Sequence, residues 1–182
     1  MARTVAVVVG SLRKESINRK LAKAIAGLLP DLKFDFVDLG LLPLYNQDLD
    51  GNAPKEWVDF RTKIKAADAV LFVTPEYNRS VPGVLKNAID IGSRPYGSSV
   101  WDKKPCAVVS ASGSAMGGFG ANHHLRQSLV FLNMPTMQQP ETYIHIGEDY
   151  FAADGSVADA RAKPYIKKIA DSFAAWVEQQ LK

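Results

Sequence analysis

The residues whose types could do chemistry lie in three loops, each of which follows a short apolar run. The first loop spans residues 10–18 and carries two hydroxyls, a guanidinium and an amide, from Ser11, Ser16, Arg13 and Asn18. It leads into a segment with helical periodicity, so backbone N–H donors and a helix dipole add to the fixed positive charge. Together these groups suit a phosphate monoester. A serine-capped start of a helix beside a solvated Arg–Lys pair explains the composition equally well.

The second and third loops have compositions that suit a flat ligand. Residues 75–83 are bracketed by Pro75 and Pro82, which fix φ and stiffen the loop, and Tyr77 could form a flat wall. Residues 111–120 are mostly Gly, Ala and Ser, so the backbone can approach a ligand closely. A capped surface turn and a flexible connector remain alternatives for these two loops taken singly.

Several other kinds of site are disfavoured by the sequence. The dinucleotide fingerprint G-x-G-x-x-G is absent after the first apolar run, and G-x-x-x-x-G-K-[ST] is absent as well. Neither G-x-S-x-G nor H-E-x-x-H occurs, so nothing favours hydrolysis. His123 and His124 are adjacent and do not share a helix face as metal ligands would, so we expect no metal site. Cys106 lies in an apolar run and is expected to be a core thiol.

Composition places the chain among globular proteins with one domain. It has 182 residues, of which 47% are hydrophobic and 23% are charged, so disorder and membrane insertion are not expected. The net charge of +3 is far from the basic footprint of a nucleic-acid-binding protein. The single cysteine fits a reducing compartment, and the first residues do not resemble a signal peptide. The expected location is the cytoplasm.

Short apolar runs alternate with longer amphipathic segments along the whole sequence. We expect strands over 4–9, 34–39, 69–74, 106–110 and somewhere within 136–146, and helices over 16–29, 54–66, 82–89, 120–132 and 157–181. This alternation predicts an α/β fold, a flavodoxin-like doubly wound five-stranded parallel sheet of order 2-1-3-4-5, in a single domain over 1–182. In such sheets ligands bind outside the carboxyl ends of the strands, where this fold brings the three loops together.

With these loops identified, the sequence resembles the NAD(P)H-dependent FMN reductase family, and within it the bacterial quinone and chromate reductases. The resemblance covers nearly the whole chain. It is carried by GSLRKESINRKLA (10–22), LPLYNQDL (42–49), TPEYNRSVPGVLKNAID (74–90), the glycine pair at 117–118 and HLRQSLVFLNMP (124–135). The Pro-Glu-Tyr-Asn loop joined to the Leu-Lys-Asn-Ala-Ile-Asp segment is a specific combination.

The resemblance implies non-covalently bound FMN as cofactor, with NADPH or NADH as hydride donor. It places the FMN phosphate in a cradle of Ser11, Leu12, Arg13, Ser16, Ile17 and Asn18. It places the isoalloxazine edge along Pro75, Glu76, Tyr77 and Asn78, with Ser112, Gly113, Ser114 and Gly117 as a third wall. It also implies a homodimer or homotetramer, in which Arg126 and Glu141 match positions of a polar network between subunits.

The function implied is that of an FMN-dependent oxidoreductase with small-molecule electron acceptors. It would take hydride from NAD(P)H and reduce quinones, with chromate, azo compounds or free flavin as further acceptors, by a ping-pong mechanism. The alternative is a flavodoxin-like electron carrier without direct NAD(P)H oxidation. Such carriers tend to be acidic for docking on their redox partners, which the net charge of +3 does not match. A regulatory module that has lost flavin is a third alternative.

Three positions depart from the family pattern. Glu15 is an acidic residue close to the expected phosphate, and we expect its side chain to point to solvent. Ile91 replaces an aromatic residue, which bears on packing or on the rim of the pocket. Gly120 stands where many members carry an arginine, which bears on the preference between NADH and NADPH.

Overall fold

The computed structural model describes residues 2–182, which form a parallel sheet of five strands in the order β2-β1-β3-β4-β5. The strands are β1 (Thr4–Val9), β2 (Lys33–Val37), β3 (Ala69–Thr74), β4 (Cys106–Ser112) and β5 (Tyr143–His145). The helices are α1 (Ile17–Gly27), α2 (Lys55–Ala66), α3 (Gly83–Gly92), α4 (Phe119–Phe131) and α5 (Ala162–Gln180). Two short 3-10 helices, η1 (Gln47–Asn52) and η2 (Glu148–Tyr150), lie in the connections. The flavodoxin-like order predicted from the sequence is confirmed.

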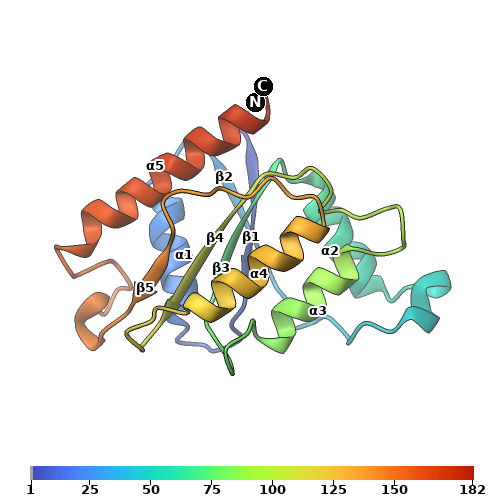
Figure 1. Cartoon of the computed structure of the whole chain (residues 1–182), viewed down its shortest axis with the longest axis horizontal. Coiled ribbons are helices and arrows are strands. Elements are labelled where there is room, and N and C mark those ends of the chain that lie inside the picture. The colour runs from blue at the N-terminus through green and yellow to red at the C-terminus, as the bar shows by residue number, and fades with distance from the viewer. Residues whose placement is uncertain (1) are drawn as a thin grey trace.

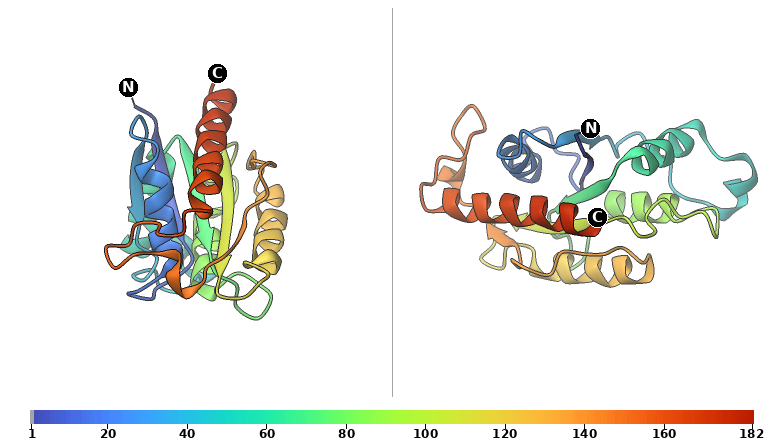
Figure 2. Two further views of the ribbon diagram at one scale, coloured as in Figure 1. Left: turned by 90° about the vertical axis from the view of Figure 1, so that its left-hand side faces the viewer. Right: turned by 90° about the horizontal axis from the view of Figure 1, so that it is seen from above.

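Helices cover both faces of the sheet (Figures 1 and 2). One core lies under α1 and α5, where Leu21 and Phe173 pack against alternate residues of β3 such as Leu71. The other lies under α2, α3 and α4, where Trp57 packs in one cluster with the intervening residues of β3, such as Phe72. All six residues of β3 are buried, because this central strand supplies side chains to both cores.

The start of α1 shows how local sequence fixes an element next to the site. Ser16 has an extended backbone, and its Oγ accepts a hydrogen bond of 3.2 Å from the Arg19 backbone N–H. This is the N-cap arrangement that serine favours. Leu21 and Ile25, one turn apart, are fully buried against the sheet and hold the helix in place.

Element boundaries differ from the expected ones where local contacts intervene. β2 occupies Lys33–Val37 rather than 34–39, and β4 continues to Ser112 because β5 pairs with its last residues. α5 begins at Ala162 rather than at 157, because Phe151 and Val157 form an antiparallel bridge around a tight turn. Pro82 lies just before α3 rather than in its first turn, and that helix continues to Gly92.

The loops that follow β1, β3 and β4 emerge at one edge of the sheet, whereas β1 begins and α5 ends at the opposite edge (Figure 1). The parallel register, with Val8 beside Phe72 and Val73 beside Val109, brings the carboxyl ends of these strands side by side. Within residues 2–182, no helix is both long and apolar enough to span a membrane.

Candidate active site at the carboxyl edge of the sheet

The first loop leaves β1 at Gly10, in close contact with the end of β3. The Gly10 N–H donates to the Val73 carbonyl oxygen at 2.9 Å. A Cβ at Gly10 would lie 2.7 Å from Thr74 Oγ1, so a larger residue would push the two strand ends apart. Glycine therefore lets the first and second loops begin next to each other.

The first loop presents buried hydroxyls beside the start of a helix. Ser11 and Ser16 are only 4% and 2% exposed. Ile17 and Asn18 open α1, so their N–H groups have no partner within the helix. Leu12 and Arg13 are exposed. The loop therefore combines two fixed hydroxyls, helix N-terminal donors and an exposed guanidinium, a donor set that suits an anion.

Asn18 connects the first loop to the third. Its side chain is buried, and Nδ2 donates to the Ala111 carbonyl oxygen at 3.2 Å. Its Oδ1 is also buried and has no hydrogen-bond partner within residues 2–182. That oxygen needs a donor, which an ionised phosphate cannot supply and a hydroxyl can. The structure thus gives Asn18 a bridging position, with an acceptor left open.

The second loop forms a two-residue hairpin. Tyr77 and Ser80 exchange two backbone hydrogen bonds of 3.0 Å, and the intervening Asn78 and Arg79 both have positive φ, at 50° and 63°. Tyr77 is 51% exposed, so its ring is accessible from solvent. Pro75 precedes the hairpin, and its carbonyl oxygen accepts from Thr74 Oγ1 at 2.8 Å.

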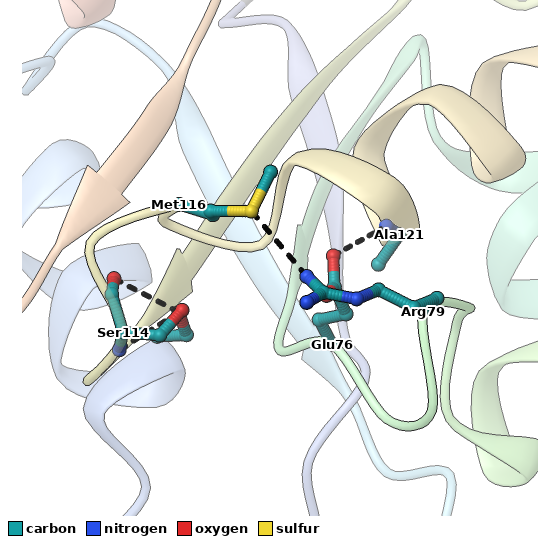
Figure 3. A network of polar contacts seen from close by, with 6 residues as sticks. Glu76, Arg79, Ser114, Met116 and Ala121 are labelled. Atoms are coloured by element: carbon teal, nitrogen blue, oxygen red, sulfur yellow. Dashed lines mark hydrogen bonds and ion pairs between the residues drawn. The ribbon is translucent and has the colours of Figure 1, made fainter.

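Glu76 joins the second loop to α4 and lies at the centre of a polar network (Figure 3). Its Oε2 accepts from the Ala121 N–H at 3.0 Å, in the first turn of α4, and its Oε1 accepts from Arg79 Nη1 at 3.0 Å. The same Arg79 Nη1 lies 3.5 Å from Met116 Sδ in the third loop. These contacts of Arg79, Met116 and Ala121 could not be predicted from local sequence patterns, because they join segments far apart in the chain.

The third loop is organised by its serines and by β5. Ser112 Oγ lies 3.1 Å from Ser114 Oγ and accepts from the Ser114 N–H at 3.3 Å. The Ser114 carbonyl oxygen lies 3.1 Å from His145 Nδ1. A Cβ at Gly113 would have only the Ile146 carbonyl oxygen at 4.0 Å, so the space in front of Gly113 is open.

Gly117 serves the packing of the third loop against the sheet. Its φ is +57°, and a Cβ there would lie 2.5 Å from the carbonyl carbon of Tyr143. The missing side chain therefore faces the backbone of β5. The sequence suggested that a small residue here lets the backbone approach a ligand. The contact with Tyr143 is a second reason why this position needs glycine.

The three positions that depart from the family pattern have defined surroundings. Glu15 points to solvent, as expected, with its side chain 79% exposed and 3.0 Å from Lys20 Nζ. Ile91 is fully buried in the core under α3, so it contributes to packing and not to a rim. A Cβ at Gly120 would lie 2.9 Å from Glu76 Oε2 and 3.1 Å from the Arg79 carbonyl oxygen. Gly120 therefore allows the second loop to pack directly on α4.

Arg126 and Glu141 form no hydrogen bond or ion pair with each other in the structure. Arg126 Nε donates to Asn122 Oδ1 at 2.9 Å and its Nη1 to the Met137 carbonyl oxygen at 3.0 Å. Its Nη2 is buried without a partner in the described chain. Glu141 is exposed, and its carbonyl oxygen accepts from Tyr165 OH at 2.6 Å.

Cys106 is a core residue, as expected. It is fully buried at the start of β4, and burial raises the pKa of its thiol from 9.0 to about 12. A thiol held neutral in this way is a poor nucleophile. Across residues 2–182 no three His, Cys, Asp or Glu side chains gather in a way that could hold a metal ion.

A groove of about 1000 Å³ lies elsewhere, between α1, α5 and the turn at 153–157. Lysines line much of it, and of the predicted site residues only Ser16 takes part. The candidate site is therefore defined by the three loops. It has a donor set for an anion in the first loop, the exposed Tyr77 in the second, and open space in front of Gly113 in the third.

Comparisons with known proteins show the family of the chain. The family model of NADPH-dependent FMN reductase matches residues 3–149. A quinone reductase of Pseudomonas putida is 58% identical over 177 residues, covering 96% of this chain and 95% of the relative. A 2-hydroxy-1,4-benzoquinone reductase of a Burkholderia species is 48% identical over 181 residues and covers 99% of both chains.

Solved structures give the same result. The flavoenzyme NAD(P)H:(acceptor) oxidoreductase FerB from Paracoccus denitrificans superposes with a TM-score of 0.93 at 42% identity, covering 98% of both chains. A flavodoxin from Pseudomonas aeruginosa, at 18% identity and a TM-score of 0.56, shares the fold alone. The match over residues 3–149 includes all three loops of the candidate site. The chain belongs to the NADPH-dependent FMN reductase family and is an FMN-dependent oxidoreductase that uses NAD(P)H.

Proposed function

We propose that this enzyme reduces quinones with electrons from NADPH or NADH, on FMN held by the three loops at the carboxyl edge of the sheet. The observation that carries the proposal is that a loop with a donor set suited to an anion emerges at the same sheet edge as the exposed Tyr77 and the open space in front of Gly113. The 58% identity to a quinone reductase over nearly the whole chain supports the choice of acceptor.

The first loop fits the phosphate end of FMN. Ser11 and Ser16 offer buried hydroxyls, Ile17 and Asn18 offer N–H groups at the start of α1, and Arg13 offers charge. Leu12 contributes through its backbone. The unpartnered Asn18 Oδ1 fits one of the hydroxyl groups of the ribityl chain, which would satisfy a buried acceptor.

The second and third loops fit the ring end. Pro75, Glu76, Tyr77 and Asn78 would line the isoalloxazine edge, largely through backbone groups of the rigid hairpin. Ser112, Gly113, Ser114 and Gly117 would form the facing wall, with Gly113 leaving room for a close approach. When bound, FMN supplies the redox chemistry, accepting hydride from the nicotinamide and passing electrons to the acceptor.

The chain itself binds and orients both substrates in this proposal. Tyr77, half exposed at the mouth, gives a flat surface for a nicotinamide or a quinone ring. Since donor and acceptor would use the same mouth in turn, the kinetics should be ping-pong. Chromate, azo compounds and free flavin are further acceptors that such an open site would admit.

We also propose that the chain acts as a single FMN-binding domain in the cytoplasm, as a homodimer or homotetramer. The end of α4 supports an oligomer, because Val130 and Phe131 are 77% and 85% exposed there. Light scattering of the purified protein tests the oligomeric state.

An anaerobic absorbance spectrum of the protein with FMN, taken before and after addition of NADPH or NADH, tests the function. We expect the flavin band to bleach and to return on addition of 1,4-benzoquinone. Bound flavin that stays yellow would indicate an electron carrier. A protein that binds no flavin would overturn the assignment of the first loop.

A matched pair of variants tests the phosphate end. Arg13→Ala should weaken FMN binding by about 1.5 to 3 kcal/mol, the range for hydrogen bonds to charged groups. Lys23→Ala, further along α1, removes the same charge away from the loop and should leave the affinity unchanged. Equal affinities of the two variants would contradict the placement of the phosphate.

A further inference from the structure

Arg79 occupies a backbone position that a long side chain does not favour. It is the second of the two residues with positive φ at the tip of the hairpin, at 63°. Glycine adopts this conformation without a steric cost, whereas a residue with a Cβ does not. The ion pair with Glu76 is weak compensation, because the Arg79 side chain is 72% exposed to solvent.

The hairpin that carries Arg79 is fixed to the start of α4. Its Ser80 Oγ lies 2.7 Å from His124 Nδ1, and Glu76 is bonded to the Ala121 N–H. The Arg79 carbonyl oxygen packs so closely on Gly120 that a Cβ there would lie 3.1 Å from it. The guanidinium is therefore presented from a rigid support.

The guanidinium reaches from the second loop to the third, toward Met116 (Figure 3). The second loop carries the exposed Tyr77 and the third has open space in front of Gly113, so Arg79, itself 72% exposed, lies on the same edge of the sheet as both. The negative charge of Glu76 does not cancel that of Arg79, because Glu76 also accepts from the positive N-terminal end of α4. Because the Arg79 side chain is 72% exposed and that of Glu76 only 12%, the pair presents its positive charge to solvent.

We infer that Arg79 is a specificity residue that favours electron acceptors carrying a negative charge, with ionised hydroxyquinones as the class of quinone selected. The inference rests on the proposed function and adds the charge of its substrate. A hydroxyl on a quinone ring is a vinylogous carboxylic acid, so such quinones are anions at neutral pH. A planar guanidinium pairs well with the resulting delocalised oxygens.

The test compares kcat/KM for 2-hydroxy-1,4-benzoquinone with that for 2-methoxy-1,4-benzoquinone, which is similar in size and neutral. We expect kcat/KM for the hydroxyquinone, divided by that for the methoxyquinone, to fall about tenfold in Arg79→Asn. An effect of this size is typical when one charge is removed near a binding site. Asparagine tolerates positive φ, so the hairpin should be kept. Arg79→Lys should restore most of the ratio.

Lys103→Asn is the matched control. Lys103 is an exposed cation that also has positive φ, at 58°, but it precedes β4 at the opposite edge of the sheet. This variant should leave the ratio unchanged. In the unmodified holoenzyme the ratio should also decrease as salt is added, a measurement that does not depend on any variant folding.

The outcomes separate the two proposals. If the unmodified enzyme reduces neither quinone, the proposed function fails and this inference fails with it. If it reduces both, but the ratio does not change with salt or in Arg79→Asn, only the role of Arg79 is overturned. A change in the KM for NADPH with an unchanged ratio would likewise overturn it, by assigning the guanidinium to the donor.

Discussion

Replacement of Glu76 by alanine should destabilise the protein mainly by uncapping α4. The Glu76 side chain is 12% exposed and accepts from the Ala121 N–H at 3.0 Å. A hydrogen bond to a charged acceptor contributes about 1.5 to 3 kcal/mol. The pair with the exposed Arg79 contributes about 0 to 1 kcal/mol. The cap should therefore dominate, with a total cost of about 2 kcal/mol.

Three variants measured by urea unfolding separate the two contributions. Glu76→Ala should lose about 2 kcal/mol, which corresponds to roughly 4 to 8 °C in Tm for a domain of this size. Glu76→Gln keeps an acceptor for Ala121 and should lose about half as much. Arg79→Ala keeps the cap and should lose less than about 1 kcal/mol. Equal losses in Glu76→Ala and Arg79→Ala would refute the reasoning, because they would place the energy in the ion pair.

Four further variants test single contacts and one raised pKa. Gly92→Ala should cost about 2 to 3 kcal/mol in urea unfolding, because its Cβ would lie 2.5 Å from Cε2 of the buried Trp101; a loss below about 0.5 kcal/mol would contradict this contact. Tyr150→Phe should raise the free energy of unfolding by about 1 kcal/mol, since it removes a buried hydroxyl without a partner in the described chain. Tyr165→Phe removes a hydroxyl that donates to the Glu141 carbonyl oxygen, so it should lower the free energy of unfolding by about 1 kcal/mol. Burial raises the pKa of Cys106 from 9.0 to about 12, so its contribution to stability should be complete below pH 9 and be lost as the pH rises toward 12. Between pH 8 and pH 11, the free energy of unfolding should therefore fall less for Cys106→Ala than for the unmodified protein. An equal fall in both proteins would argue against the raised pKa.

Much of the fold follows from patterns that are local in the sequence. The continuous apolar runs at 4–9 and 69–74 coincide with β1 and β3, because strands buried on both faces need apolar residues at every position. β5 was located only within 136–146. It has three residues, and its limits depend on pairing with the end of β4, which no local pattern encodes.

The meeting of the three loops of the candidate site at one edge of the sheet was predictable from the sequence. Parallel strands bring the three loops to one edge of the sheet, as the predicted strand order implied. The roles of single residues within them depend on long-range contacts. Asn18 bonds to Ala111 and Gly117 packs on Tyr143, and each of these contacts joins residues that are far apart in the sequence. The local composition of a loop does not indicate which distant residues it will contact.

The placement of the two ends of the chain has a practical consequence. β1 begins and α5 ends at the edge of the sheet opposite the three loops (Figure 1). A tether at either end, to a surface, an electrode or a second protein, would hold the enzyme with its substrate-facing side turned outward. Immobilisation through either terminus should therefore leave the approach of nicotinamides and quinones unobstructed.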